Sequence, residues 1–210
     1  MSHDSRSNRR LLYEIADAQG GYFTADQALG VGYAYSQQHF HRQSWAWEQV
    51  ARGLFRLRDY PPGEREDLIR WSLWSRNQKG IPQAVISHET ALTVHDLSDV
   101  MPAAIHLTVP PAFRKRTPAG CVLHRASLSP IDSEQRIGFC VTTPLRTLMD
   151  VAESALSQEF LNQAVLGALQ RGLVRRPALA TVACSSAARA RLNQALTAAL
   201  AEELGHDRAI

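Results

Sequence analysis

The sequence predicts an α+β protein, in which a small N-terminal domain of three helices and a β-hairpin precedes a mixed α/β domain with a helical C-terminal part. Three observations predict this class. Segments with helical spacing come first, an alternating pair of segments follows them, and extended apolar runs then give way to an Ala/Leu-rich end. The apolar fraction of 45% and the charged fraction of 20% are ordinary for a globular protein.

A Pro-Pro-Gly run at 61–63 marks the clearest boundary in the chain. The length of 210 residues suits one large domain or two small ones. We therefore expect a disordered arm over 1–8, a first domain over 9–62, a second domain over 63–203 and a tail over 204–210.

The first domain is expected to begin with a helix over Arg9–Gln19, whose apolar residues recur at helical spacing before a Gly-Gly pair. Thr24 with Gln27 three positions later is a capping-box pattern, which predicts a second helix over Ala25–Leu29. A third helix is expected over about Tyr33–Ser44. The second and third helices are separated by a tight Gly-containing turn.

A β-hairpin is expected next, because Glu48–Val50 and Leu54–Arg58 alternate around Arg52-Gly53. Three helices, a tight turn between the second and third, and a hairpin after them are the element order of a winged helix-turn-helix. The N-terminal domain is therefore predicted to have this fold.

The second domain is expected to mix helices with short extended runs. Ser87 is expected to cap a short helix, and Thr143-Pro144 is a strong helix start. The expected helices are Glu66–Arg76, one from Ser87 through Thr93–Leu97, one starting at Thr143-Pro144, Gln158–Arg171 and about Pro177–Glu203; the expected extended runs are Ala104–Val109, Val122–His124 and Gly138–Val141.

The third helix carries the stretch YSQQHFHRQ, which raises the question of a metal site. His39 and His41 are two positions apart and point roughly 160° apart on a helix, so they cannot bind one ion. Helical metal pairs are spaced i, i+4 instead. No metal site and no cofactor are therefore predicted.

Double-stranded DNA is the better partner for this helix. At about 100° per residue, Phe40 is expected to anchor a core-facing stripe, and the opposite edge is expected to carry Tyr35, Gln38, His39 and Arg42, with Ser36 and His41 on the flanks. Arg, His and Gln side chains match base edges in the major groove. No Asp or Glu occurs from Gln27 to Trp47 that would repel phosphates. In the hairpin, Arg52, Arg56 and Arg58 are expected to meet phosphate or the minor groove.

The charge is unevenly distributed along the chain. Residues 1–99 hold 11 Lys/Arg against 12 Asp/Glu, whereas residues 100–201 hold 11 against 5. A basic surface of this kind favours a polyanion, although an ordinary solvated surface gives the same count. The residues expected to add phosphate contacts are Arg114, Lys115, Arg116, Arg171, Arg175 and Arg176.

Catalysis is not expected. Ser87, His88 and Glu89 suggest a hydrolase, but Ser87 is explained as a helix cap and the next two residues as an exposed first turn. The nucleophile-elbow, P-loop and dinucleotide-binding patterns do not occur. Arg146 and Asp150, at i, i+4, are expected to form a surface ion pair.

A cytoplasmic location is expected. No apolar run approaches the roughly 20 residues that a membrane-spanning helix needs, so no membrane partner is predicted. Cys121, Cys140 and Cys184 form no CxxC pair and are odd in number, which favours reduced thiols over a disulfide framework.

Five segments together resemble the AbiEi-family antitoxins of bacterial type IV toxin–antitoxin systems. They are GGYFTADQAL, GYAYSQQHFHRQ, WEQVARGLFRLRDYP, SHETALTVHDLSDVMPAAIHLTVP and VTTPLRTLMDVAE, and the resemblance covers about residues 11–176. No single motif is decisive, but the order and spacing of the segments are specific.

This resemblance implies an N-terminal winged helix-turn-helix that represses its own operon and an α/β domain needed for antitoxin activity. It places the recognition helix on Ser36–Arg42 and the wing on Glu48–Arg58. The implied partners are repeated operator DNA and a nucleotidyltransferase-like toxin, whose effect is counteracted without obligatory tight binding. Two alternatives stay open: an antitoxin whose winged helix binds protein, and a winged-helix regulator outside any toxin–antitoxin operon.

Overall fold

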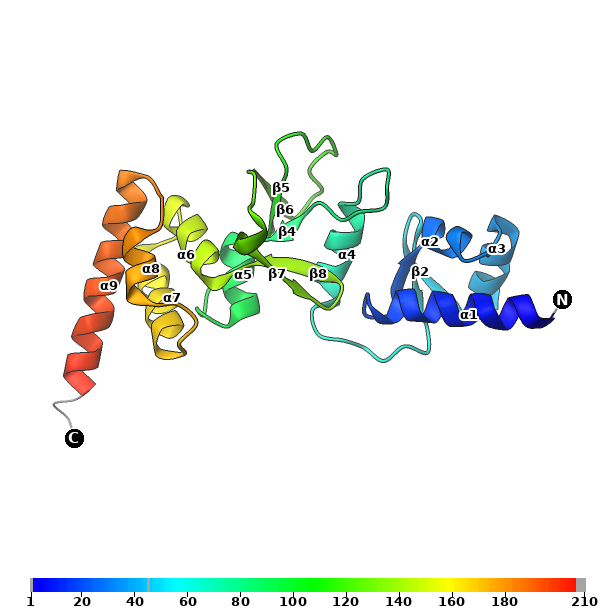
Figure 1. Cartoon of the computed structure of the whole chain (residues 1–210), viewed down its shortest axis with the longest axis horizontal. Coiled ribbons are helices and arrows are strands. Elements are labelled where there is room, and N and C mark those ends of the chain that lie inside the picture. Colours follow the sequence, from blue (N-terminus) through cyan, green and yellow to red (C-terminus); the bar gives the residue numbers. More distant parts are fainter. Residues whose placement is uncertain (1, 45, 207–210) are drawn as a thin grey trace. The chain divides into compact units, whose positions relative to one another are not determined.

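The computed structural model describes residues 2–44 and 46–206 and divides into two compact units. The first unit contains the described residues up to Ala84 together with Gln135–Phe139, and the second contains Val85–Glu134 and the described residues from Cys140 onward. Both units mix helices and strands (Figure 1), so the protein is of the α+β class.

The first unit packs helices against a small antiparallel sheet. Its strands lie in the order β1-β3-β2, and all neighbours are antiparallel. The elements in chain order are α1 (Ser2–Asp17), β1 (Tyr22–Thr24), α2 (Ala25–Gly30), α3 (Tyr35–Gln43), β2 (Trp47–Ala51), β3 (Leu54–Leu57) and α4 (Glu66–Trp74).

The core of this unit is aromatic. The Trp47 ring meets the edge of Phe23 at 4.8 Å between ring centroids, and Phe55 lies 5.8 Å from Phe23. Leu12 and Ala16 of α1 complete the cluster from the helical side. Burial of these rings holds α1 and the sheet together, since each large aromatic removes 150 to 250 Å² from water by the usual rough measure.

Helix α4 is joined to the sheet of the first unit by a partly buried polar contact. Glu66 accepts hydrogen bonds from the Tyr22 hydroxyl at 2.7 Å and from Arg56 Nη2 at 3.0 Å. Burial and the bond to Glu66 raise the pKa of Tyr22 to about 12. The same unit includes the segment Gln135–Phe139, in which Gly138 approaches Ile69.

The second unit is built on a five-stranded mixed sheet of order β6-β5-β4-β8-β7. β4 pairs antiparallel with β5 and parallel with β8, and β5 pairs parallel with β6. The elements that contribute to it are β4 (Val85–Ile86), α5 (His88–His95), β5 (Ile105–Val109), β6 (Cys121–Arg125), the 3-10 turn η1 (Pro130–Asp132), β7 (Ser133–Arg136), β8 (Phe139–Thr142), α6 (Pro144–Glu153), α7 (Gln158–Gln170), α8 (Arg176–Thr181) and α9 (Ser186–His206).

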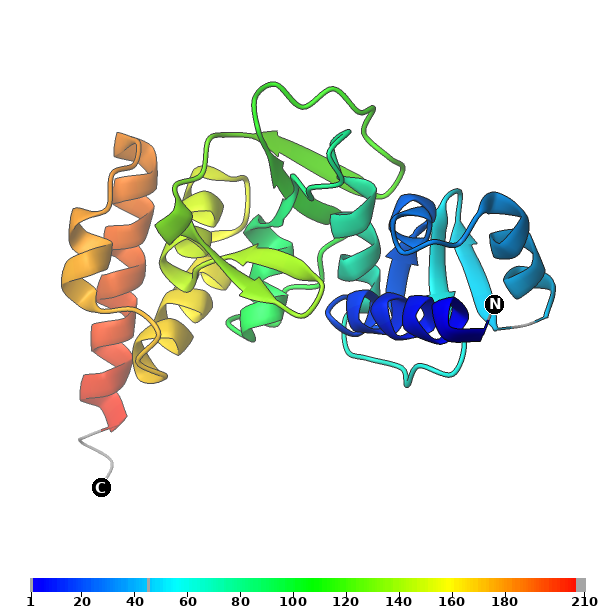
Figure 2. The same cartoon turned by 45° about the vertical axis from the view of Figure 1, so that its right-hand side comes forward.

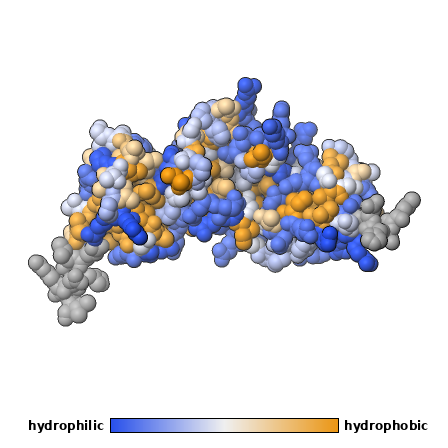
Figure 3. Space-filling view, in the orientation of Figure 1, coloured by the Kyte–Doolittle hydropathy of each residue, from blue (hydrophilic) through white to orange (hydrophobic). Residues whose placement is uncertain are grey.

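Helices α5 to α9 share one apolar core with fully buried Leu92, Leu148, Leu161 and Leu192. Figures 1 and 2 both show α7 and α9 running side by side. Figure 3 shows broad hydrophobic areas on the visible face of this helical part. None of the helices in residues 2–44 and 46–206 is long and apolar enough to cross a membrane.

Many predicted elements are confirmed. Thr24 and Gln27 form the capping box of α2, with Gln27 N donating to Thr24 Oγ1 at 3.3 Å and Thr24 N to Gln27 Oε1 at 2.9 Å. The hairpin of β2 and β3 turns at Arg52-Gly53, and the Thr143 side chain caps α6. Cys121, Cys140 and Cys184, all within the described residues, form no disulfide and are half buried.

Other expectations are wrong. Helix α1 begins at Ser2, so residues 2–8 of the predicted arm are helical, while residue 1 lies outside the described residues. The long last helix is broken into α8 and α9, and α9 runs on to His206 within the predicted tail, whose remainder is not described. The two-residue β4 and the polar β7 carry no apolar alternation and were not predicted.

Candidate nucleic-acid interface

Helix α3 begins directly after the turn that follows α2. Gly32 takes φ +99° there, and the Gln37 side chain caps α3 by accepting from Ala34 N at 2.9 Å. The helix ends with His41 and Arg42 in its last turn, and it contains no acidic residue. Cations near the C-terminal end of a helix are favoured by its dipole.

The inward face of α3 differs from the prediction. The Gln38 side chain is 4% exposed, and its amide donates to the carbonyl oxygens of Ala25 at 3.2 Å and Tyr33 at 3.0 Å. Phe40, expected in the core, is 63% exposed. The phase prediction is therefore wrong: Gln38 is a structural residue that DNA cannot reach in this conformation, and Phe40 lies on the outer face.

His41 also points inward. Its ring stacks on Trp47 with centroids 4.8 Å apart and meets the edge of Tyr33 at 5.2 Å. Burial, with a smaller effect of Arg9, lowers the pKa of His41 below its ordinary value. The imidazole is therefore neutral near pH 7 and helps to seat α3 on the hairpin.

The outer face keeps most of the predicted residues. Tyr35 is 67% exposed, and the exposed positions of the helix are Tyr35, Ser36, Gln37, His39, Phe40, Arg42 and Gln43. Donors and acceptors therefore share this face with two aromatic rings. Gln43 is an exposed residue of this face that was not singled out from the sequence.

The hairpin lies against α3. Arg42 Nη1 donates to Gln49 Oε1 of β2 at 2.6 Å, and both side chains are exposed. Arg52, at the hairpin turn, and Arg58, just after β3, are exposed. The predicted role of Arg56 is not supported by its position, because its guanidinium bonds Glu66 and the Tyr60 carbonyl oxygen, at 3.0 and 2.9 Å.

The six additional basic residues belong to the second unit. Arg114–Arg116 lie in the exposed loop between β5 and β6. Arg171 donates from Nη1 to the carbonyl oxygens of His95 and of the residue after it, at 2.6 and 2.7 Å, and so holds the end of α5. Arg175 is exposed and Arg176 half buried at the start of α8.

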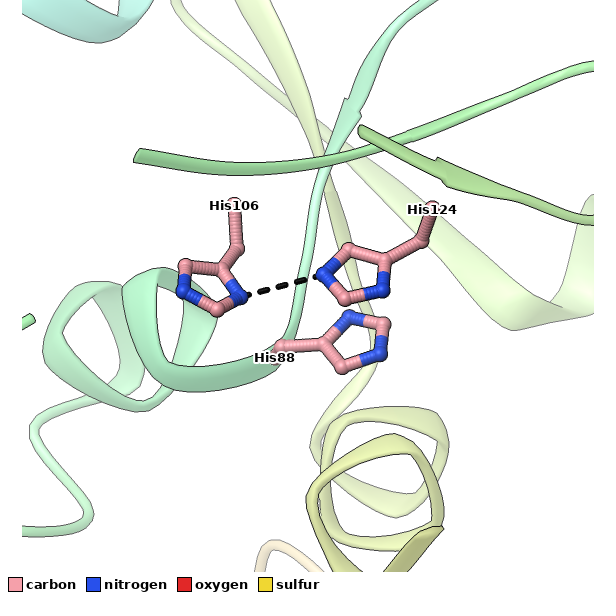
Figure 4. Close-up of side chains that lie close together, drawn as sticks. All are labelled: His88, His106 and His124. Carbon is pink, nitrogen blue, oxygen red and sulfur yellow. Dashed lines mark hydrogen bonds between the residues drawn. The ribbon is translucent and has the colours of Figure 1, made fainter. Parts of the chain in front are cut away.

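A second cluster of chemically active side chains lies in the second unit. His88, His106 and His124 each offer a ring nitrogen, and these atoms lie within 4.8 Å of one another (Figure 4). His106 Nδ1 is 3.0 Å from His124 Nε2 and 2.8 Å from Glu89 Oε2. The rings of His88 and His124 stack with centroids 3.4 Å apart.

Local structure fixes this cluster. His106 and His124 lie on the paired strands β5 and β6, at a stagger of two residues that puts both on one face of the sheet. His106 N donates to Thr90 Oγ1 at 2.9 Å, which ties β5 to α5. His88, the first residue of α5, has φ +52°, a strained conformation for a residue other than glycine.

Burial and charge set the ionisation of this cluster. Burial, with a further contribution from His124, lowers the pKa of His88 to about 3. Burial also lowers the pKa of His124. Burial alone would raise the pKa of Glu89, but the contact with His106 and other partners outweighs it and lowers the value to about 2. Two neutral imidazoles therefore face a carboxylate near pH 7.

This cluster was not predicted from the sequence. Ser87 occupies the N-cap position of α5 but makes no side-chain cap bond, and its Oγ lies 3.0 Å from His88 Nδ1. His88 is 9% exposed, so the predicted exposed first turn is wrong. The prediction of no metal site considered only His39 and His41. One signal was present in the sequence, because each of two predicted strands contains a histidine. The register that pairs these strands was not predictable from it.

No model of a known protein family matches the chain, and a search of curated proteins finds no match.

Proposed function

We propose that the first unit is a winged helix-turn-helix that binds double-stranded DNA through α3 and the β2–β3 hairpin, and that the protein is a transcriptional repressor. The observation that carries this proposal is the exposed, acid-free outer face of α3, joined to the hairpin by the Arg42–Gln49 bond of 2.6 Å. The order of three helices and a three-stranded antiparallel sheet supports it.

Three side chains of this face are suited to reading bases. His39, Arg42 and Gln43 are exposed, and such side chains match the acceptors of guanine or both groups of adenine in the major groove. The exposed Phe40 ring can contact a thymine methyl group. Arg52 and Arg58 are placed to neutralise phosphates.

The resemblance to AbiEi-family antitoxins extends this proposal to the protein's role in the cell. We propose that it represses its own toxin–antitoxin operon in the cytoplasm and counteracts a nucleotidyltransferase-like toxin, without catalysis. Repression of a reporter by the upstream region tests the first part. Rescue of cells that express an adjacent nucleotidyltransferase-like gene tests the second.

DNA binding is tested by fluorescence anisotropy with duplexes from the region upstream of the gene, over a series of salt concentrations. His39→Ala and Arg42→Ala should each weaken specific binding by about 1 to 3 kcal/mol. Arg52→Ala should reduce the salt slope by about 0.9. Arg70→Ala, which removes the same charge from the exposed side of α4, is the matched control and should change neither quantity.

Binding equal to wild type in both α3 variants would contradict the assignment of the recognition helix. No binding to any upstream duplex at low salt would overturn the repressor proposal.

A second candidate function rests on the exposure of Tyr35 and Phe40, at 67% and 63%. Exposed aromatic rings are enriched in protein interfaces. In this alternative α3 binds a partner protein, as in an antitoxin that acts by protein contact. Phe40→Ala would then abolish antitoxin activity while the chain binds no DNA.

The basic residues of the second unit carry a separate part of the DNA proposal. Charge reversal at Arg114–Arg116 should reduce the salt slope if this loop contacts phosphates. An unchanged affinity and slope would remove the loop from the DNA interface.

A further inference from the structure

Four residues of the second unit, at one end of α5 and on two adjacent strands, bring lone-pair donors together. His88 of α5, His106 of β5 and His124 of β6 each place a ring nitrogen within 4.8 Å of the other two, and Glu89 Oε2 lies 2.8 Å from His106 Nδ1. Nothing in the proposed DNA-binding function uses them. We propose that these four residues bind one divalent transition-metal ion of the Zn²⁺ class, through three imidazoles and one carboxylate.

Proton counting favours a metal ion over a hydrogen-bond network. His106 Nδ1 lies 2.8 Å from Glu89 Oε2 and 3.0 Å from His124 Nε2. A single proton on Nδ1 can be shared well with only one of these two neighbours. A cation can accept lone pairs from all three atoms together.

Glu89 is positioned like a ligand. Its Oε1 accepts from the Ser154 hydroxyl at 3.3 Å, whereas Oε2 is buried and has no hydrogen-bond partner. His106 Nδ1 lies 2.8 Å from Oε2, within ion-pair distance, but the same nitrogen is also 3.0 Å from His124 Nε2. A buried carboxylate oxygen without a partner is costly, and coordination of an ion would remove that cost.

The two distances at His106 lie close to those between ligand atoms of one coordination sphere. Ligand atoms about 2.0 to 2.1 Å from a tetrahedral Zn²⁺ are about 3.3 Å from one another. The contacts of 3.0 and 2.8 Å around His106 need only a small expansion to reach this value. Imidazole nitrogen and carboxylate oxygen are both ligands that Zn²⁺ takes in proteins.

His88 must turn to join the other ligands. Its ring is nearly parallel to that of His124, at 12°, and lone pairs lie in the ring plane. Rotation of the ring would bring Nε2 toward the ion. Ser87 Oγ, now 3.0 Å from His88 Nδ1, can then accept from Nδ1–H and orient the ligand, as outer-sphere partners of metal-bound histidines do.

A nearby cation does not prevent this site. Arg146 influences His88 electrostatically, but its guanidinium is paired with Asp150 at 2.8 Å and with Asp132 at 3.5 Å. The positive charge of Arg146 is therefore balanced before an ion binds. One carboxylate and three imidazoles leave a net charge of +1 on a bound divalent ion.

The test uses the untagged full chain, treated with a chelator, dialysed and titrated with Co²⁺ without DNA. We expect the intense visible absorption of four-coordinate Co²⁺ to saturate at one equivalent and to be displaced by Zn²⁺. The thermal transition should also rise with added Zn²⁺, because an ion that binds the folded state stabilises it. Absence of a saturable signal in the wild-type chain overturns the proposal, and because DNA is left out it does not affect the DNA-binding proposal.

Variants locate the site. His124→Ala should weaken Co²⁺ affinity more than about 100-fold, since even outer-sphere changes cost 10- to 100-fold. Glu89→Gln, which keeps the shape of the side chain, should weaken it at least about tenfold. His39→Ala removes an exposed histidine from α3 and is the matched control, with unchanged affinity.

Each variant is checked for folding by circular dichroism in chelator. If His124→Ala does not fold, Glu89→Gln decides alone. If a folded His124→Ala or Glu89→Gln variant binds Co²⁺ as tightly as wild type, the assignment of these residues as metal ligands is overturned.

Discussion

At the scale of single residues, Arg146 and Asp150 show how burial changes the meaning of a sequence pattern. Their i, i+4 spacing predicted a surface ion pair, and the pair forms, with Arg146 Nε donating to Asp150 Oδ1 at 2.8 Å. The surface location is wrong, because Asp150 is 6% exposed and its Oδ2 has no hydrogen-bond partner. Burial outweighs the attraction of Arg146 and raises the pKa of Asp150 to about 6.

Asp150 should make stability depend on pH. The folded carboxyl binds its proton below about pH 6, whereas an unfolded aspartate does so below about pH 3.9. Between these values the folded state holds more protons, so the free energy of unfolding falls as pH rises, on the order of 2 to 3 kcal/mol.

The measurement is urea unfolding of wild type and Asp150→Asn in chelator across this pH range. The free energy of unfolding of wild type, relative to that of Asp150→Asn, should fall as pH rises from about 3.9 to about 6. Parallel pH profiles would contradict the prediction.

At the scale of an element, α3 shows that helical periodicity has a phase that its own residues do not determine. The apolar Phe40 was assigned to the core, but the side chain of α3 that stacks on the buried Trp47 is His41. Gln38 faces inward instead, because its amide satisfies two backbone carbonyl oxygens at Ala25 and Tyr33. Leaving a buried carbonyl oxygen without a hydrogen-bond donor costs more free energy than leaving an aromatic ring exposed.

This phase predicts a large loss of stability for one substitution and almost none for another substitution two positions away. Gln38→Ala should lower the free energy of unfolding by about 1 to 3 kcal/mol, because two carbonyl oxygens lose their donor. Phe40→Ala should change it by no more than about 0.5 kcal/mol, because the ring is 63% exposed. Chemical denaturation measures both, and a larger loss for Phe40→Ala would restore the predicted phase.

At the scale of the whole molecule, the first unit is assembled from two separate stretches of chain. Residues Gln135–Phe139 join it although they follow some fifty residues of the second unit in sequence. Gly138 has φ +77°, and a Cβ there would lie 2.9 Å from Ile69 of α4. The Pro-Pro-Gly run that predicted a boundary at 61–63 precedes α4, which belongs to the first unit.

Gly138→Ala tests this packing. The left-handed backbone alone should cost about 1 to 2 kcal/mol, and the contact with Ile69 should add about 1 to 3 kcal/mol. Gly120→Ala is the matched control, because Gly120 has φ +76° and no atom within 4 Å of its added Cβ. Thermal unfolding compares the two variants. Equal losses of stability would show that the close approach of the added Cβ to Ile69 is not destabilising.

Features that depend on residues a few positions apart were predictable from the sequence alone. The Thr24–Gln27 capping box, the hairpin turn at Arg52-Gly53 and the helix start at Thr143-Pro144 are local hydrogen-bond and backbone preferences, so they were predicted at the observed positions.

Only the tertiary structure decided which face of α3 is exposed and which histidines meet. His88, His106 and His124 are eighteen residues apart from one to the next, and only the pairing of β5 with β6 beside α5 brings their nitrogens within 4.8 Å. Strand register and helix phase depend on how distant parts of the chain fill a common core. Sequence spacing cannot determine strand register or helix phase, because the residues that pack against each other in the core are far apart in the sequence.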